Sequence, residues 1–116
     1  MGRPERVSEA AVNVLVLETS EDQEKGLQHL DRIPSDTLYV FPVVPEGTVF
    51  HSMNVPEPFD IAFLREDYFV LTLARMVPES DRIKAPKASA MAVEAKAGNL
   101  ARWGFYPGNT MSPIAE

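Results

Sequence analysis

The polar residues that could carry chemistry concentrate in residues 50–63, which read FHSMNVPEPFDIAF. His51, Asn54 and Asp60 lie there among apolar residues, and two prolines restrict the backbone between them. A polar group buried without a partner is costly, so such residues either bond to the local backbone or face a cleft. Arg75, on a later predicted strand, could converge with Asp60. We therefore predict His51, Asn54, Asp60 and Arg75 as ligand-binding residues.

Catalytic roles for these residues stay open. Successive side chains on a strand point to opposite faces, so His51 and Ser52 do not form a nucleophile–base pair. Asn and Asp side chains commonly bond to turn backbone, and this structural role is favoured for Asn54 and Asp60. A small hydrolase or lyase that uses Asp60 with His51 or Arg75 is an alternative, and the catalytic residues are unknown.

The sequence offers little to hold a metal ion or a cofactor. It contains two histidines and no cysteine. It also lacks an EF-hand loop and the glycine-rich pattern of a phosphate loop. We predict neither a metal site nor a cofactor.

The charge balance argues against nucleic acid as a partner. The chain carries 11 basic and 17 acidic residues, for a net charge of −6, whereas non-specific nucleic-acid binding needs a positive surface. Arg82, Lys84 and Lys87 form a local basic run, which is typical of a solvated loop. We expect no binding to nucleic acid.

The length of 116 residues suits one domain. Residues 1–10 are polar and predict a flexible arm, and residues 11–116 predict a single domain. No apolar run approaches the ~18 residues of a membrane span, and no apolar stretch follows the first arginines as in a secretory signal. We expect a cytoplasmic protein, or an exported one whose leader has been removed.

Hydrophobic patterning predicts two short helices among many strands. Residues 11–18 are apolar on both faces, which is typical of an interior strand. Ser20 and Gln23 match a capping box, so a helix is predicted from Ser20 to about Leu30. A second helix should end at Gly104. The predicted ranges are 97–103 for that helix, 77–88 for a loop, and 38–41, 48–54, 59–64, 68–76, 90–95 and 109–112 for the other strands.

This order of elements predicts the fold class. Strands dominate and the two helices are separated by a run of strands, which is typical of α+β proteins. The ten prolines and the short strands favour curvature over a flat sheet. We therefore expect a small, strongly curved or barrel-like, mostly antiparallel sheet with two short helices.

Four segments carry motifs in a recognisable order: Gly26-Leu27, TLYVF at 37–41, the segment 50–63, and KAGNLARWGFYPGN at 96–109. With these motifs the chain resembles the uncharacterised bacterial and archaeal family catalogued as domain of unknown function 192. His51 stands where that family has tryptophan, and Ser52-Met53 replaces its Met-Lys. The family has no agreed activity, so the resemblance implies a fold and a candidate surface rather than a reaction.

The thin catalytic inventory favours a non-enzymatic accessory module that binds a small ligand or a protein. A curved sheet with polar residues beside apolar ones could present a shallow groove for either. A structural self-association domain, such as a homodimer, is the other alternative to the hydrolase or lyase. A concave pocket around Asn54 and Asp60 would favour binding, whereas a buried sheet edge would favour self-association.

Overall fold

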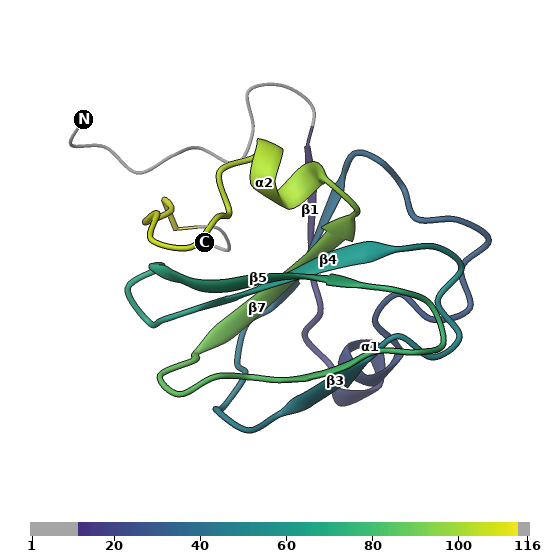
Figure 1. Ribbon diagram of the computed structural model, residues 1–116, viewed down its shortest axis with the longest axis horizontal. Coiled ribbons are helices and arrows are strands. Elements are labelled where there is room, and N and C mark those ends of the chain that lie inside the picture. The colour runs from purple at the N-terminus through teal and green to yellow at the C-terminus, as the bar shows by residue number, and fades with distance from the viewer. Residues whose placement is uncertain (1–11, 114–116) are drawn as a thin grey trace.

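The structure is a computed structural model that describes residues 12–113. The described chain begins with a strand, which is followed by a short helix, a run of strands and a second short helix (Figure 1). The elements are β1 (Asn13–Val16), α1 (Ser20–Lys25), β2 (Thr37–Phe41), β3 (Val49–His51), β4 (Phe59–Leu64), β5 (Val70–Met76), β6 (Arg82–Lys84), β7 (Met91–Lys96) and α2 (Asn99–Arg102). The predicted arm over residues 1–10 lies outside the described residues.

Five strands form one sheet in the order β1-β2-β7-β4-β5, and β3 pairs with β6 in a second, two-stranded sheet. Only the β1–β2 pair is parallel, and the other pairs are antiparallel. The α+β class with two short helices and a mostly antiparallel sheet is therefore confirmed. The five-stranded sheet is open, because β1 and β5 stand at opposite edges.

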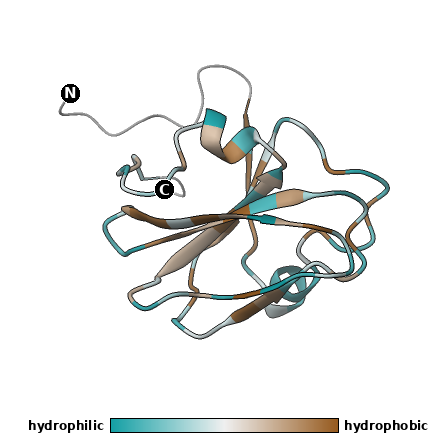
Figure 2. Cartoon of the chain, viewed as in Figure 1, coloured by the Kyte–Doolittle hydropathy of each residue, from teal (hydrophilic) through white to brown (hydrophobic). Residues whose placement is uncertain are grey.

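The five-stranded sheet has β7 in its middle, and both of its faces are buried. We call them the β3 face and the α2 face after the elements that cover them, which lie on opposite sides of the sheet in Figure 1. The β3 face carries Tyr39, Phe41, Phe59, Ile61, Phe63 and Ala92, with Phe50 of β3 packed on it. The α2 face carries Leu38, Val40, Ala62, Leu64, Val93 and Ala95, with Leu100 and Phe105. Hydrophobic residues follow these strands, whereas α1 is mainly hydrophilic (Figure 2).

The prediction of an interior strand over residues 11–18 is wrong. Among the described residues β1 pairs only with β2, and it forms an edge of the sheet. Val14 is 42% exposed and Leu15 is 47% exposed. Apolar residues on both faces of a strand do not guarantee a neighbouring strand on both sides, and within residues 12–113 β1 has a neighbour on one side.

The first helix is shorter than predicted. Thr19, rather than Ser20, is the N-cap, because its Oγ1 accepts a hydrogen bond from the Asp22 N–H at 3.0 Å. The helix ends at Lys25, and Gly26 follows with a φ of +50°. That conformation suits glycine and turns the chain out of the helix well before Leu30.

The predicted strand over 48–54 shrinks to β3 because the chain turns at Ser52. Ser52 is fully buried, donates its hydroxyl to the Val77 carbonyl at 2.5 Å and accepts from the Asp81 N–H at 2.9 Å. These bonds hold the 77–88 segment against β3, and that segment contains β6 where a loop was predicted. Further along, the predicted strand over 109–112 shrinks to bridge residues at Thr110 and Met111, where Thr110 pairs with Phe69.

Candidate functional site

A buried carboxyl group lies on the middle strand of the sheet. Glu94 on β7 pairs with Tyr39 of β2 and Ile61 of β4, so its side chain is on the β3 face. Glu94 is only 4% exposed. Within residues 12–113 its side chain has no hydrogen bond or ion pair to another residue, and its oxygens are open to a pocket. Carboxyl groups are seldom buried without a partner, which marks Glu94 as unusual.

Glu94 forms part of the lining of a pocket with a volume of about 430 Å³. The pocket lies between the sheet, β3 and the end of α1. Its apolar lining consists mainly of Leu27, Phe41, Val44, Phe50, Val55 and Phe59. The volume is within the roughly 300–1,000 Å³ typical of small-molecule sites. A cavity with a mixed apolar and polar lining, and with the acid Glu94 in its wall, is therefore present on the β3 face.

Gly26 lets the backbone after α1 approach this acid closely. A Cβ atom at Gly26 would lie 3.7 Å from Glu94 Oε1 and 3.6 Å from Phe41 Cζ. Both are ordinary contact distances, so a side chain there would occupy the space beside the carboxyl group. The glycine thus keeps that part of the pocket open, and its φ of +50° also favours glycine.

The apolar surroundings change the acidity of Glu94. Removal from water disfavours the charged form of a carboxyl group. Burial raises the pKa of Glu94 from 4.5 to about 8. The pocket therefore contains a carboxylic acid that is largely protonated at neutral pH, and it can donate or accept a hydrogen bond.

The other polar side chains of the pocket mostly have partners already. Gln23 donates to the Leu17 carbonyl at 2.7 Å, and Thr48 donates to the Pro45 carbonyl at 2.8 Å. Gln28 donates to the Glu24 carbonyl at 2.9 Å. Glu94 is thus the polar group of the lining that is best placed to meet a ligand.

Of the four residues predicted as ligand-binding, only His51 lines this pocket. His51 ends β3 and is half-buried, and its Nδ1 accepts from the Met53 N–H at 3.1 Å. Asn54 lies just outside the pocket with a φ of +63°. Its Nδ2 donates to Gln28 Oε1 at 3.2 Å, and its carbonyl accepts from the His29 N–H at 2.8 Å. Asn54 therefore supports the rim.

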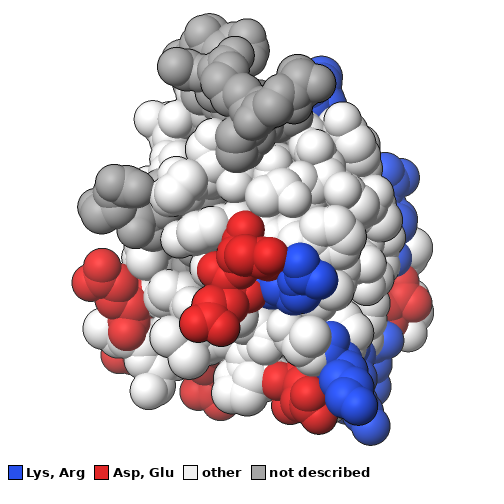
Figure 3. All heavy atoms as spheres, turned by 90° about the vertical axis from the view of Figure 1, so that its left-hand side faces the viewer, with Lys and Arg blue, Asp and Glu red and all other residues white. Residues whose placement is uncertain are grey.

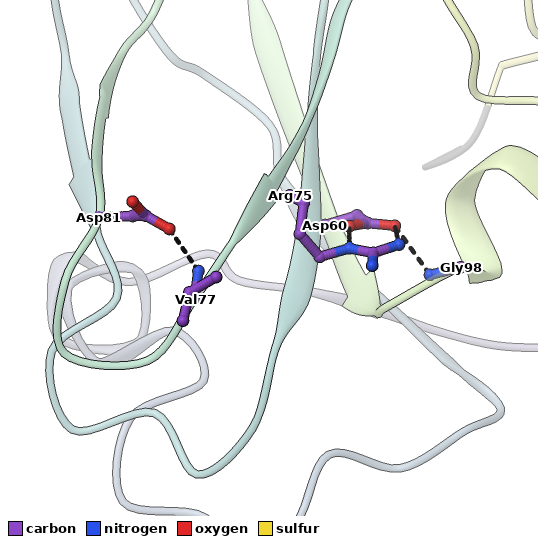
Figure 4. A network of polar contacts seen from close by, with 5 residues as sticks. All are labelled: Asp60, Arg75, Val77, Asp81 and Gly98. Atoms are coloured by element: carbon purple, nitrogen blue, oxygen red, sulfur yellow. Dashed lines mark hydrogen bonds and ion pairs between the residues drawn. The ribbon is translucent and has the colours of Figure 1, made fainter.

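Asp60 and Arg75 come together on the α2 face, away from the pocket (Figure 4). Arg75 Nε lies 2.5 Å from Asp60 Oδ1, and the Gly98 N–H donates to Asp60 Oδ2 at 2.8 Å. Asp60 is 4% exposed, whereas the Arg75 side chain is 56% exposed. The Asp60 carboxylate raises the pKa of Arg75 above its usual value. Both Asp60 oxygens are occupied, and the acid fixes the start of α2.

The segment between the two prolines is held by a residue that the sequence analysis passed over. Asn54 and Asp60 were expected to bond to nearby backbone, and Asp60 bonds to Gly98 instead of the proline segment. Glu57 lies between the prolines, and its Oε2 accepts from the Ile33 N–H at 2.6 Å. This bond lowers the pKa of Glu57, with a smaller contribution from Lys96 at 3.5 Å.

The basic run lies on the exposed side of the small sheet. Arg82 and Lys84 are exposed on β6, whereas Ile83 between them packs toward the β3 face. Figure 3 shows one face of the molecule, on which acidic and basic side chains lie close together on a largely uncharged surface. Within residues 12–113, no three His, Cys, Asp or Glu residues are arranged to hold a metal ion. Neither helix in that range is long and apolar enough to cross a membrane.

A comparison with protein families shows to which family this chain belongs. The model of domain of unknown function 192 (DUF192, uncharacterized ACR) matches residues 4–113. The chain belongs to the DUF192 family. No curated protein matches the chain significantly.

Two solved structures share the fold of this DUF192 chain. A protein of unknown function from Novosphingobium aromaticivorans is 26% identical, with a TM-score of 0.73, and the match covers 85% of this chain and 73% of that one. A protein from Sinorhizobium meliloti described as a candidate transcription regulator is 24% identical, with a TM-score of 0.70. That match covers 85% of this chain and 78% of the other. The second likeness shows the fold alone.

Three of the four segments that carry the DUF192 resemblance meet at the pocket, and the segment 96–109 does not line it. Gly26 and Leu27, Phe41 at the end of β2, and Phe50 and His51 of β3 all contribute to its lining. These residues are far apart in sequence, and the fold places them around Glu94. Glu94 itself was missed. Its only signal is a lone acid within an apolar strand, MAVEAK at 91–96, whose alternation puts it on the same face as Ala92.

Proposed function

We propose that this DUF192 domain is a non-enzymatic module that binds a small ligand in the pocket on its β3 face. The observation that carries the proposal is Glu94, a 4% exposed acid whose side chain has no partner in residues 12–113 and lines a cavity of about 430 Å³. Buried polar groups normally have partners. A ligand that bonds to Glu94 supplies the missing one.

The arrangement of the other predicted residues favours binding over catalysis. His51 lines the pocket, whereas Asp60 lies on the opposite face of the sheet. A general base must reach the proton that it removes, so this separation counts against a hydrolase that uses both. Asp60 with Arg75 is a paired, structural arrangement on the α2 face, so the hydrolase or lyase alternative has little support.

The test is a titration of the isotope-labelled protein with a set of aromatic fragments. Binding is measured from the changes in backbone amide chemical shifts in NMR spectra. The expected shifts concentrate on the pocket lining, including the 26–28 segment and β3. Two valines offer a matched pair of blocking variants, because Val49 lines the pocket and is 49% exposed, while Val77 does not line it and is 48% exposed. Val49→Trp should weaken binding and Val77→Trp should not. Shifts confined to the α2 face, or equal effects of the two variants, would contradict the proposal.

Self-association through β1 is a second candidate. β1 is an edge strand whose Val14 and Leu15 are 42% and 47% exposed, and an exposed edge can add a strand from a second copy. Sedimentation velocity of the wild-type protein should then show a dimer that Leu15→Lys abolishes. Val43→Lys, at a 71% exposed valine outside the strands, is the control. A wild-type protein that stays monomeric at high micromolar concentration would exclude this candidate.

A further inference from the structure

A hydrogen-bond acceptor of the backbone lies near the carboxyl group of Glu94. The carbonyl oxygen of Gln23 lies 3.9 Å from the position of a Gly26 Cβ, and Glu94 Oε1 lies 3.7 Å from that same position. The C-terminal end of α1, with its partial negative charge, therefore borders the same space. Glu24 is a second acidic residue of the lining. The set of groups suits a donor carrying positive charge better than it suits an anion.

The cations near the pocket are not bound to this acid. Lys25 and His51 contribute to the lining, but no ion pair joins either of them to Glu94 within residues 12–113. The ion pairs of that range are Arg65–Asp67, Arg75–Asp60 and Lys96–Glu57, all of them outside the pocket. A positive ligand group at Glu94 would therefore displace no existing ion pair.

We propose that the pocket binds a small organic ammonium compound with a compact aromatic or branched apolar body, whose charged nitrogen bonds to the Glu94 carboxylate. This inference rests on the proposed function and names the ligand class of the same site. The apolar body would pack on Phe41 and Phe50, whose rings meet edge to face with centroids 5.1 Å apart. A hard metal ion is a poor alternative, because such ions need several oxygen ligands.

Binding of an ammonium group has a consequence for protons. Glu94, with a pKa of about 8, is mostly protonated at pH 6, and an ammonium group stays charged below roughly pH 10. The carboxyl O–H bond must therefore break on binding, and its proton passes to the buffer while the carboxylate pairs with the ligand nitrogen. Lys25 and Glu24 from α1, His51 from β3 and Tyr39 from β2 are the other titratable groups facing this region.

Three probes of the same shape test the ligand class: 2-phenylethylamine, 2-phenylethanol and phenylacetate. Calorimetry at pH 6 and pH 9, in buffers of different ionisation enthalpy, measures affinity and the number of protons released. At pH 9 the amine should bind at least about tenfold more tightly than the alcohol, as expected for a buried charge-assisted hydrogen bond. At pH 6 its binding should release close to one proton and should be weaker by up to about tenfold for each pH unit below 8.

Glu94→Gln is the decisive variant, because it keeps the shape of the side chain and removes the charge. In this variant the amine should bind no more tightly than the alcohol, and proton release should vanish. Glu18→Gln removes the same charge at an exposed position outside the pocket and should behave as the wild type.

The possible results distinguish failure of the ammonium inference from failure of the proposed function. If the alcohol or phenylacetate binds as tightly as the amine and shifts the pocket residues, the pocket function stands and the ammonium inference is wrong. Preference for the amine that persists in Glu94→Gln would likewise overturn the inference. If all three probes fail to bind at millimolar concentration and the fragment titration also finds no pocket ligand, the proposed function fails together with this inference.

Discussion

Replacing Glu94 with glutamine should stabilise the protein, and the gain should grow with pH. In the folded state burial raises the pKa of Glu94 to about 8, against 4.5 for an exposed glutamate. Between these two values the unfolded chain has released the proton and the folded chain still holds it. The folded state is therefore favoured below pH 4.5, and this contribution is lost as the pH rises to 8.

The size of the effect follows from the pKa difference. One pKa unit corresponds to about 1.36 kcal/mol, so a shift of this size costs the wild type about 5 kcal/mol once the pH exceeds 8. At pH 7 the cost is roughly 3 kcal/mol on the same basis. Glutamine cannot ionise, so Glu94→Gln should match the wild type near pH 4.5 and exceed it increasingly above that. A domain is commonly stable by only about 5–15 kcal/mol, so the change is measurable.

Urea unfolding at several pH values between 4.5 and 9, followed by fluorescence of Trp103, measures this difference. Trp103 is the single tryptophan of the chain and packs on the α2 face, so it reports unfolding away from the substituted site. Glu18→Gln is the matched control, because it removes one charge at an exposed position and should give a nearly constant difference. If the difference between Glu94→Gln and the wild type is also constant, burial does not raise the pKa of Glu94 and the argument for a poorly hydrated, unpaired acid fails.

Three further outcomes follow from the fold and the charge. Asp60→Ala should lower the free energy of unfolding by about 1–3 kcal/mol because the Gly98 N–H loses its acceptor, and Asp60→Asn should cost less; unchanged urea midpoints would contradict this role. Val14→Asp at the exposed edge should cost less than about 1 kcal/mol, whereas Val93→Asp in the middle strand should cost several kcal/mol, so equal losses would refute the edge assignment. The protein, with a net charge of −6, should not shift duplex DNA in a gel at physiological salt; a shift that weakens as salt rises would overturn that expectation.

Local patterns predicted the elements whose limits are set by neighbouring residues. β4 spans Phe59–Leu64 as predicted, because Pro58 prevents an earlier start and the 65–67 turn ends it. Gly104 follows α2 with a φ of +98°, as a left-handed helix cap requires. In these places the determining interactions lie within a few residues.

Elements whose limits depend on distant partners were predicted less well. The apolar pattern of β1 is compatible with an interior strand and with an edge strand, and only the arrangement of the sheet distinguishes them. β6 is three residues long and exists because it pairs with β3 across a long separation in sequence. Cross-strand pairing of this kind leaves little trace in a short segment.

In the candidate site, too, features set by nearby or paired residues were easier to predict than features set by the arrangement of the whole sheet. Asp60 and Arg75 were considered as a pair for a hydrolase or lyase, and they meet because they are register partners on the adjacent strands β4 and β5, outside the pocket. His51 was grouped with Asp60 because the two are close in sequence, yet the sheet lies between them. Residues close in sequence need not lie on the same face of the sheet when the chain leaves a strand between them. The segment 50–63 leaves β3 at Ser52.

Glu94 could be found from sequence only by asking what an interior strand does with a charged residue. MAVEAK has small apolar residues around one acid, and in a middle strand both faces are buried. An acid there needs a partner, and the sequence cannot show that the groups near it, Gly26 and Phe41, leave it without one. An unpaired acid lowers stability at neutral pH, so its presence in the middle of the sheet argues for a use that a better-packed residue would not serve. Burial of unpaired Glu94 lowers the stability of the free protein at neutral pH. A cation bound beside the carboxylate would offset this loss, which links the buried acid to the ligand pocket.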